Sequence, residues 1–555
     1  MKLLNDILNN VPEFGQLLAA MDSGRCPVAL SGLSAVHRAH FAAGVYARTG
    51  RPVVLVCADE GEGERLARDL ESLTGQRVPV LAPRSYIFHN AATVSRQWEH
   101  RRLALMRAMA AGEVPLLVAA VEGLLQRTLP PEELDRAWAE LRTGGSYDLN
   151  QLAETLTAAG YSRCDQVEGV GQFALRGGIL DVYSPGMEQP VRAEFFGDEL
   201  DAMGLFDPAT QRRTENVERA VLLPAAEALP HLAPGGTAGL AARLEKLAAG
   251  AEKAGRHELA QTLRQDREAL EQGRSFPATD RYLALIYPQL ATAADYLPPD
   301  ACVLFSESSR VGERAKTYQW QLEEDAKSLM ERGELDGSCA VLSRTFPELN
   351  ARLSDWPTAY LDSFTLSAYP VPPGCLLSVT AKQLPSFGAS LETAVSDLDH
   401  YQRSGLGTLV LVSSEQRALN LQTLLREQGL RAAVEFQPQT LPGPGETLVS
   451  VGGLSAGMEY PEARLAVLTE GQGAALKKPR PRKAATNREK LKSYADLSPG
   501  DLVVHEHHGV GRYMGMVKLP ADGVEKDYVK IAYAGSDVLY VPATQLDLVS
   551  KYIGS

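Results

Sequence analysis

The sequence predicts a multidomain α/β protein with an inserted α+β domain and a small C-terminal β-barrel. Three observations support this prediction. The chain has 555 residues, enough for about four domains at roughly 150 residues each. Over residues 1–125, apolar strand-like runs alternate with helical ones, which is typical of a parallel sheet covered by helices. Residues 496–555 are instead dense in β-branched and aromatic residues at strand spacing, which favours a barrel of about five strands.

Composition excludes several classes of protein. Hydrophobic residues make up 45% of the chain and charged residues 23%, which is ordinary for globular domains and excludes wholesale disorder. The net charge of −13 means that any DNA contact must come from a local basic patch. No apolar run approaches the ~20 residues of a membrane span, and the polar N-terminus does not resemble a signal peptide. Six widely spaced cysteines without a C-x-x-C pair argue against a disulfide framework or a structural zinc site, and predict a cytoplasmic location.

Residues 1–127 are predicted to form the first part of an α/β lobe. Its apolar runs have the length and composition of buried strands, and the segments between them have helical periodicity. We expect strands at 28–31, 53–57, 78–81 and 115–120, and helices at 35–49, 61–73 and 98–111.

Residues 128–222 are predicted to be a compact α+β insert, because the pattern changes after two consecutive prolines at 130 and 131. Short strand-like runs follow one another, joined by glycine and aspartate turns. We expect a helix at 149–159 and strands at 173–183, 191–196 and 198–207.

Two further α/β segments follow the insert. Residues 223–344 are predicted to complete the lobe, with a long, charged and solvated helix around 240–272. Residues 345–472 are predicted to form a separate α/β domain. We expect strands at 301–306 and 338–342 in the first segment, and at 408–412, 432–435, 447–451 and 465–468 in the second.

Residues 473–495 are predicted to be a flexible basic linker to the barrel at 496–555. The stretch ALKKPRPRKAATNREKLK, in which Lys477 and Lys492 mark the ends of the basic run, holds eight basic residues and one acidic residue. Its prolines and charge are typical of an extended tether. It could make a weak contact with DNA phosphates, or it could act only as a solubilising tether.

The turn after the first expected strand resembles a phosphate-binding loop from which the necessary residues are missing. Gly32 matches the first glycine of the pattern G-x-x-x-x-G-K-[ST]. However, His37 replaces the second glycine, Arg38 replaces the lysine, and Ala39 lacks the hydroxyl that would hold magnesium. We therefore expect an ordinary helix N-terminus here rather than a nucleotide cradle.

A second nucleotide motif is also incomplete. The apolar strand expected at 301–306 is followed by Glu307, and Ser306 stands where a helicase lobe would carry the aspartate that holds magnesium. Because both halves of the site are deficient, the sequence predicts no ATP hydrolysis, no catalytic residue, and no bound ATP, magnesium or other metal in this chain.

The insert carries motifs that resemble a known family. The stretch RGGILDVYSP at 176–185, followed by AEFFGDE at 193–199, is similar to domain 2 of the excision-repair protein UvrB. Along the chain, a lobe with an incomplete phosphate-binding loop is followed by this insert and then by the rest of the lobe, with its second incomplete motif. This order resembles the N-terminal half of the bacterial transcription-repair coupling factor family, Mfd. The resemblance implies a degenerate helicase-like (RecA-like) lobe and an insert that binds UvrA.

The C-terminal segment supports the same family independently. The stretch PGDLVVHEHHGVGRY at 499–513 resembles the RNA polymerase interaction domain of that family, which is related to CarD-type regulators. The resemblance implies a small SH3/Tudor-like barrel that binds the β subunit of RNA polymerase. It also implies a monomeric adaptor whose motor, an ATP-dependent translocase on double-stranded DNA that uses ATP and magnesium, lies beyond residue 555.

Three residues of the insert are candidates for contacting UvrA by resemblance: Arg163, Phe173 and Arg176. Guanidinium groups and aromatic rings are the side chains that most often dominate protein interfaces. The alternative is that Arg176 forms a local ion pair with Asp181 or Glu194, and that Phe173 belongs to the core.

The barrel could bind polymerase by accepting a strand at an open edge. By resemblance this edge runs through 503–506. The candidate contact residues are Val503, Val504, His505, Glu506, Arg512 and Tyr513. A zinc site at His505, His507 and His508 is disfavoured, because adjacent residues of a strand point to opposite faces.

Three functions remain to be weighed. The first is an adaptor that recruits UvrA through the insert and polymerase through the barrel. The second is a UvrB-type ATP-dependent repair enzyme, which would require an intact phosphate-binding loop. The third is a CarD-like polymerase-binding regulator with an unrelated N-terminal half. The incomplete motif around Arg38 disfavours the second function, and the insert motif around Arg176 disfavours the third, so the sequence favours the adaptor.

Overall fold

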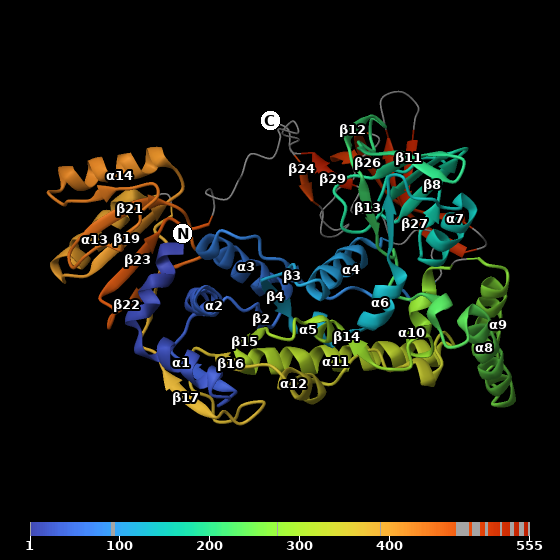
Figure 1. Ribbon diagram of the computed structural model, residues 1–555, viewed down its shortest axis with the longest axis horizontal. Helices are drawn as coiled ribbons and strands as arrows, with labels where there is room; N and C mark the ends of the chain where they lie inside the picture. The colour runs from blue at the N-terminus through green and yellow to red at the C-terminus, as the bar shows by residue number, and fades with distance from the viewer. Residues whose placement is uncertain are drawn as a thin grey trace. The chain divides into compact units, whose positions relative to one another are not determined.

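A computed structural model describes residues 2–89, 95–274, 276–388, 390–472, 488–490, 500–505, 509–521, 524–532, 538–542 and 549–552. The described residues up to 472 form one compact unit, and those from 488 onwards form a second (Figure 1). The mixed α/β multidomain class predicted from the sequence is confirmed. None of the described helices is both long enough and apolar enough to cross a membrane.

The centre of the larger unit is a parallel seven-stranded sheet with the order β17-β1-β16-β15-β2-β4-β3. Strands separated by more than three hundred residues therefore lie side by side. The strands are β1 (Val28–Ser31), β2 (Val53–Cys57), β3 (Val80–Leu81), β4 (Leu116–Ala120), β15 (Cys302–Ser306), β16 (Thr358–Leu361) and β17 (Cys375–Ser378).

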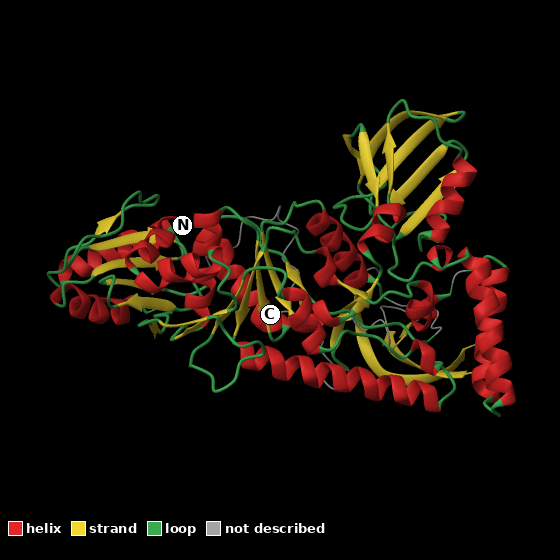
Figure 2. Cartoon of the chain, turned by 60° about the horizontal axis from the view of Figure 1, so that its bottom comes forward, coloured by secondary structure: helices red, strands yellow, loops and turns green. Residues whose placement is uncertain are grey.

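Helices pack against this sheet and bury its apolar side chains in two clusters, one on each face. The longest helix, α11 (Ser308–Glu331), runs along the larger unit (Figure 2). The other helical elements and short strands of the lobe are η1 (Lys2–Asn10), α1 (Pro12–Asp22), α2 (Ala35–Thr49), α3 (Glu60–Thr74), α4 (Gln97–Ala110), α5 (Val121–Leu125), β5 (Arg127–Thr128), η2 (Pro230–Leu232), η3 (Pro277–Tyr282), α10 (Leu283–Ile286), β14 (Ala291–Thr292), η4 (Ala293–Tyr296), η5 (Gly337–Cys339) and α12 (Phe346–Leu353).

Three expectations for the lobe differ from the structure. The long helix expected around 240–272 is two helices, α8 (Gly236–Lys253) and α9 (His257–Glu271), which lie side by side (Figure 1). Gly255 separates them at a φ of 74°, a left-handed conformation that glycine adopts without strain. The strand expected at 338–342 is absent, and η5 stands in its place. The sheet also continues past the boundary expected at 345, because β16 and β17 pair with β1.

The insert is an α+β domain built on a six-stranded sheet with the order β12-β11-β10-β9-β8-β7. A short antiparallel ribbon of β6 and β13 joins its two ends, so the chain enters and leaves at the same place. Its elements are α6 (Pro131–Ala137), β6 (Ala139–Arg142), α7 (Leu149–Ala158), β7 (Ser162–Arg163), β8 (Gln172–Arg176), β9 (Ile179–Tyr183), β10 (Val191–Phe196), β11 (Glu199–Phe206), β12 (Arg213–Asn216) and β13 (Arg219–Leu222).

A second α/β domain forms the C-terminal part of the larger unit. Its sheet has the order β18-β22-β23-β19-β21-β20 and a core of its own beneath two helices. The elements are β18 (Lys382–Leu384), α13 (Leu391–Arg403), β19 (Gly407–Val412), α14 (Glu415–Glu427), β20 (Ala433–Val434), β21 (Thr447–Val451), β22 (Gly457–Tyr460) and β23 (Leu465–Thr469).

The smaller unit is an antiparallel sheet with the order β24-β29-β25-β26-β27-β28. Its first strand falls within the segment expected to be a linker, because Arg488–Lys490 pairs with β29. Within the described residues β24 and β28 do not pair, so the sheet is curled but not closed there. The strands are β24 (Arg488–Lys490), β25 (Leu502–His505), β26 (Gly509–Ala521), β27 (Val524–Ala532), β28 (Val538–Pro542) and β29 (Val549–Tyr552). The RecA-like lobe and the SH3-like barrel remain predictions.

A buried cluster of charged side chains fixes the point where the insert meets the lobe. Arg84 donates two hydrogen bonds to Asp280, at 2.7 and 2.9 Å. Its Nε lies 3.1 Å from Glu227, which lies shortly after β13, the last strand of the insert, and Arg102 contacts the same carboxylate at 3.2 Å. Glu99 accepts from the Glu227 backbone amide at 2.7 Å. The Arg84 cluster (Arg84, Glu99, Arg102, Glu227 and Asp280) therefore joins four distant segments of the chain, and each side chain is at least 95% buried.

We expect Glu227→Gln to destabilise the larger unit by about 3–5 kcal/mol, because Arg84 and Arg102 would be left buried without their shared carboxylate. Urea unfolding followed by tryptophan fluorescence would measure the loss. The control is Arg264→Ala, which breaks an exposed ion pair with Glu252 and should cost less than about 1 kcal/mol. Equal shifts in the two variants would contradict a stabilising role for the cluster.

Candidate functional site

The turn at Gly32 and Leu33 corresponds to the phosphate-binding loop considered in the sequence analysis. Its backbone amides contact other parts of the protein. Gly32 has a φ of 89°, and a Cβ at this position would overlap the backbone carbonyl of Val379. The amides of Gly32 and Leu33 donate to the carbonyls of Ser363 and Asp362 at 3.2 and 3.1 Å. In a phosphate-binding loop, such amides would instead point at the ligand.

Arg38, which stands where the lysine of the motif would be, forms a buried network within the protein. Its guanidinium donates to Ser306 Oγ at 2.9 Å, to the Leu33 carbonyl at 2.8 Å and to Glu307 Oε1 at 2.6 Å. Ser306 in turn donates to Glu62 at 2.8 Å. Burial lowers the pKa of Arg38, and the neighbouring carboxylates oppose that shift. The two incomplete motifs predicted from the sequence therefore contact each other.

The charge around Arg38 disfavours an anionic ligand. Glu62, Glu307 and Asp362 are all near enough to Arg38 to influence its pKa electrostatically. Burial also raises the pKa of Asp362 to about 6. A nucleotide phosphate would have to displace these carboxylates from Arg38, and Ala39 is fully buried with no group to offer a metal.

His37 and His40 pack against the second α/β domain. His40 Nδ1 lies 2.8 Å from the Tyr460 hydroxyl, and its Nε2 lies 2.9 Å from the Leu4 carbonyl. Because a carbonyl can only accept, Nε2 carries the proton and Nδ1 accepts from Tyr460. The His37 ring packs edge-on against the Tyr460 ring, with their centroids 5.2 Å apart. Burial lowers the pKa of His37 to about 3 and that of His40 to about 4.

A second contact joins the same two domains. Asp69 of α3 accepts from the Ser455 amide at 2.7 Å, from the Ser455 hydroxyl at 2.5 Å and from Gln472 at 2.6 Å. Burial nevertheless raises the pKa of Asp69 to about 6. No local pattern predicts this contact, because its partners lie almost four hundred residues apart in the sequence.

In the insert, the structure places the three candidate residues in different environments. Arg176 donates to Asp181 at 2.8 Å while its side chain remains 52% exposed, so the local ion pair and the accessible surface coexist. Arg192 holds the same carboxylate with two hydrogen bonds. The interpretation of Phe173 as a contact residue is corrected: its ring is completely buried in the core of the insert. Arg163 lies on the edge strand β7.

Two exposed apolar residues of the insert escaped the sequence reasoning. Phe196, at the end of β10, is 86% exposed, and Ile179, opposite Arg176 in the ladder, is 38% exposed. Both occur within the motifs quoted above. The strand alternation around Arg192 and Glu194 could have assigned Phe196 to the face opposite the core.

In the smaller unit, the expected open edge at 503–506 is corrected. β25 has neighbours on both sides, β26 and β29, so its backbone is already paired. Val503 and Tyr513 belong to the core, while Arg512 is exposed and donates to the Gly500 carbonyl at 3.1 Å. Val504 and His505 lie on β25.

The surface of the smaller unit is apolar at several described positions. Leu502, Met514, Met516 and Tyr540 are 38–49% exposed. Glu506, His507, His508 and the basic run apart from 488–490 lie outside the described residues. Among the residues that are described, no three metal-ligating side chains gather.

Comparison with known proteins identifies two segments of the chain. Residues 139–227 match the UvrB interaction domain, and residues 497–553 match the CarD-like/TRCF RID domain. Over 554 residues, 98% of this chain, the sequence is 31% identical to the transcription-repair-coupling factor of Bacillus subtilis. Identity is 30% to the factor of Staphylococcus haemolyticus, over the whole of this chain, and 27% to that of Staphylococcus aureus, over 96% of it. The chain spans about half the length of these relatives, 46–47%.

We expect His40 to make the stability of the larger unit fall as the pH decreases from 6.5 towards 4. In this window the unfolded chain binds a proton at His40 and the folded chain does not, so acid favours unfolding. Between pH 7 and 5 the loss should be about 2 kcal/mol for His40. Urea unfolding of the wild type and of His40→Gln at both pH values measures the difference.

Comparing the wild type with His40→Gln separates the effect of His40 from that of Asp69, which is present in both proteins. Because the pKa of Asp69 is raised in the folded state, Asp69 makes the stability rise as the pH decreases below 6. His40→Gln should lose stability at pH 7 and show a weaker dependence on pH. An identical pH dependence in the two proteins would show that His40 is not held neutral in the folded state.

Proposed function

We propose that this chain is the partner-binding half of a transcription-repair-coupling factor. In this role it is an adaptor that links RNA polymerase to excision repair by recruiting UvrA. The observation that carries the proposal is the match of residues 139–227 to the UvrB interaction domain, within a chain that resembles coupling factors over nearly its whole length. The match of residues 497–553 to the CarD-like/TRCF RID domain supports the polymerase arm.

One face of the insert sheet, which we call the open face, carries Arg176, Ile179, Asp181, Arg192 and Phe196. These residues have the chemistry of a protein interface. Arg176 and Arg192 converge on Asp181, which fixes their guanidinium groups in place. Ile179 and Phe196 add exposed apolar area on the same sheet. Arginine and aromatic side chains held rigidly in this way lose little entropy on binding. We propose that this face, with Arg176 as its central contact, binds UvrA.

The smaller unit is proposed to bind the β subunit of RNA polymerase. Because β25 is internal, strand addition would have to use one of the outer strands, β24 or β28. Tyr540 on β28 is 42% exposed and could contact the added strand. Two modest interfaces on one chain raise the effective concentration of repair proteins near polymerase.

We propose that the chain itself does not hydrolyse ATP and holds no ATP, magnesium or other metal. This proposal is supported by the carboxylates that surround Arg38 and by the use of the Gly32 and Leu33 amides within the protein. Translocation on DNA is proposed for the whole coupling factor rather than for this chain. Weak DNA contact through the basic run from Lys477 to Lys492, a monomeric state and a cytoplasmic location remain predictions.

We expect Arg176→Ala to weaken the binding of UvrA about tenfold or more, because a central arginine of an interface typically contributes 2 kcal/mol or more. Asp181 would keep its two bonds to Arg192, so the insert should remain folded. Calorimetric titration of purified UvrA into the full chain measures the affinity.

The matched control is Arg219→Ala. Arg219 is similarly exposed, at 55%, and pairs with Glu140 on the β6–β13 ribbon rather than on the open face. It should bind UvrA as the wild type does. If the wild type does not bind UvrA, the repair arm of the proposal is wrong, and the chain would be a polymerase-binding protein only.

A further inference from the structure

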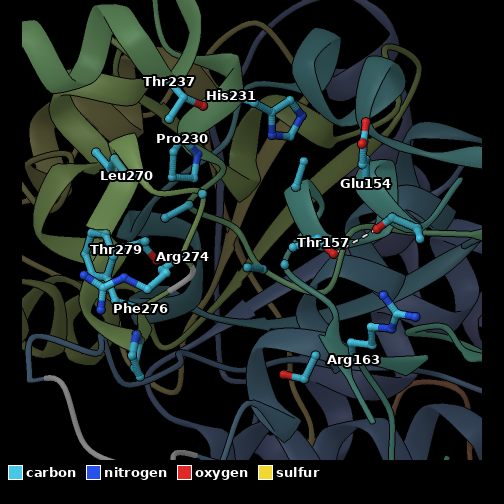
Figure 3. A pocket seen from close by; sticks show the side chains of 18 of the residues that line it. Glu154, Thr157, Arg163, Pro230, His231, Thr237, Leu270, Arg274, Phe276 and Thr279 are labelled. Atoms are coloured by element: carbon cyan, nitrogen blue, oxygen red, sulfur yellow. Dashed lines mark hydrogen bonds between the residues drawn. The ribbon is translucent and has the colours of Figure 1, made fainter. Parts of the chain in front are cut away.

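A cavity of about 910 Å³ separates the insert from the helical part of the lobe. Figure 3 shows Glu154, Thr157 and Arg163 of the insert on one side, and Leu270, Arg274 and Phe276 on the other. Its volume is near the upper end of the range for ligand sites. Neither nucleotide motif and no residue of the open face around Arg176 contributes to it.

The cavity is positively charged in a chain whose net charge is −13. Arg96, Arg163 and Arg274 line it, against a single carboxylate from Glu154. Burial lowers the pKa of His231, which also lines the cavity, so this ring adds no charge near neutral pH. The lining therefore favours an anionic occupant.

Two of these guanidinium groups are available to a ligand. Arg96 is held by Glu99 at 2.8 Å and by the Pro277 carbonyl at 3.2 Å. Arg163 and Arg274 are both exposed, and within the described part of the chain neither guanidinium makes a hydrogen bond or an ion pair. They lie on opposite walls of the cavity, Arg163 on the insert and Arg274 in the segment that follows α9 (Figure 3).

The rest of the lining is mixed: Leu175, Leu270 and Phe276 supply apolar surface, and the polar side chains of Asn150, Thr157, Ser162, Thr237 and Thr279 lie among them. A uniformly charged polyanion would leave this apolar surface unused, and a rigid duplex would not enter a concave site. The charge and the apolar area together fit a segment that carries carboxylates beside an apolar side chain.

The edge of the insert sheet favours an extended peptide over a small molecule. Ser162 and Cys164 of this edge donate their amides to Gly171 and Phe173 of the neighbouring strand, each at 2.9 Å. Residues of a parallel strand alternate in the direction of their backbone groups, so the N–H and C=O of Arg163 face away from the sheet. Ser162 and Arg163 also line the cavity. An unpaired edge of this kind is a template for an added strand.

We infer that this cavity is a second protein-binding site, which takes an extended acidic peptide with an apolar side chain. The carboxylates of the peptide pair with Arg163 and Arg274, its apolar side chain packs on Leu270 and Phe276, and its backbone extends the insert sheet beyond β7. The inference does not rest on the proposed function. It uses Arg163, which is also a candidate contact for UvrA by resemblance, but its test depends on Arg274, which is not.

The test selects peptides from a phage-displayed random library on the immobilised full chain, with counter-selection on Arg274→Glu. We expect enrichment of sequences that carry aspartate or glutamate around an apolar residue. A synthetic peptide of the enriched sequence, labelled with fluorescein, should bind the wild type about tenfold or more tightly than Arg274→Glu in fluorescence anisotropy. Thermal unfolding followed by circular dichroism checks that the variant is folded.

Two control variants locate the site. Arg426→Glu makes the same charge change at an exposed arginine of α14, far from the cavity in the fold, and should bind the peptide as the wild type does. Arg176→Ala should also retain the peptide. Failure to enrich any peptide that depends on Arg274, or an equal loss with Arg176→Ala, would overturn the inference. If the wild type binds a labelled single-stranded DNA and Arg274→Glu does not, the ligand of the cavity is a nucleic acid. That result would also overturn the inference.

Discussion

The arrangement of the larger unit depends on the ion pairs around Arg84. Charges removed from water are tolerated only when each finds a partner, and in the Arg84 cluster each carboxylate contacts an arginine from another segment. Glu227 lies shortly after β13, so its contacts anchor the segment through which the chain returns from the insert to the lobe. Tyr161 adds to this by donating to the Leu223 carbonyl at 2.5 Å.

The network around Arg38 follows the same principle of pairing each buried charge. Arg38 is buried, and its hydrogen bonds go to Ser306, Glu307 and the Leu33 carbonyl. These contacts make the region a structural junction, in which the groups around the guanidinium belong to the protein itself. His40 and Asp69 extend this junction to the second α/β domain.

The surfaces proposed for partners have a different character from these junctions. Arg176 shares Asp181 with Arg192 and still remains half exposed, so its orientation is fixed while its outer edge is available. Phe196, at the end of β10 in the same sheet, is almost fully exposed. A preorganised arginine and a solvent-facing aromatic ring cost little to order on binding. The charges that hold the fold together are therefore buried and paired, whereas those on the surface proposed for recognition are only partly paired and remain accessible.

Local periodicity in the sequence determined many of the elements, because a helix or a buried strand is specified by the spacing of its own apolar residues. The bounds expected for β1, β2, α2 and β10 agree with the structure. The incomplete motifs also singled out Arg38, Ser306 and Glu307, which contact one another in the structure. Only the tertiary structure decided that β16 joins β1, that β25 is internal, that Phe173 is buried and that Arg163 and Arg274 line the same cavity. These facts depend on strand pairing and burial between distant segments, which no local pattern encodes.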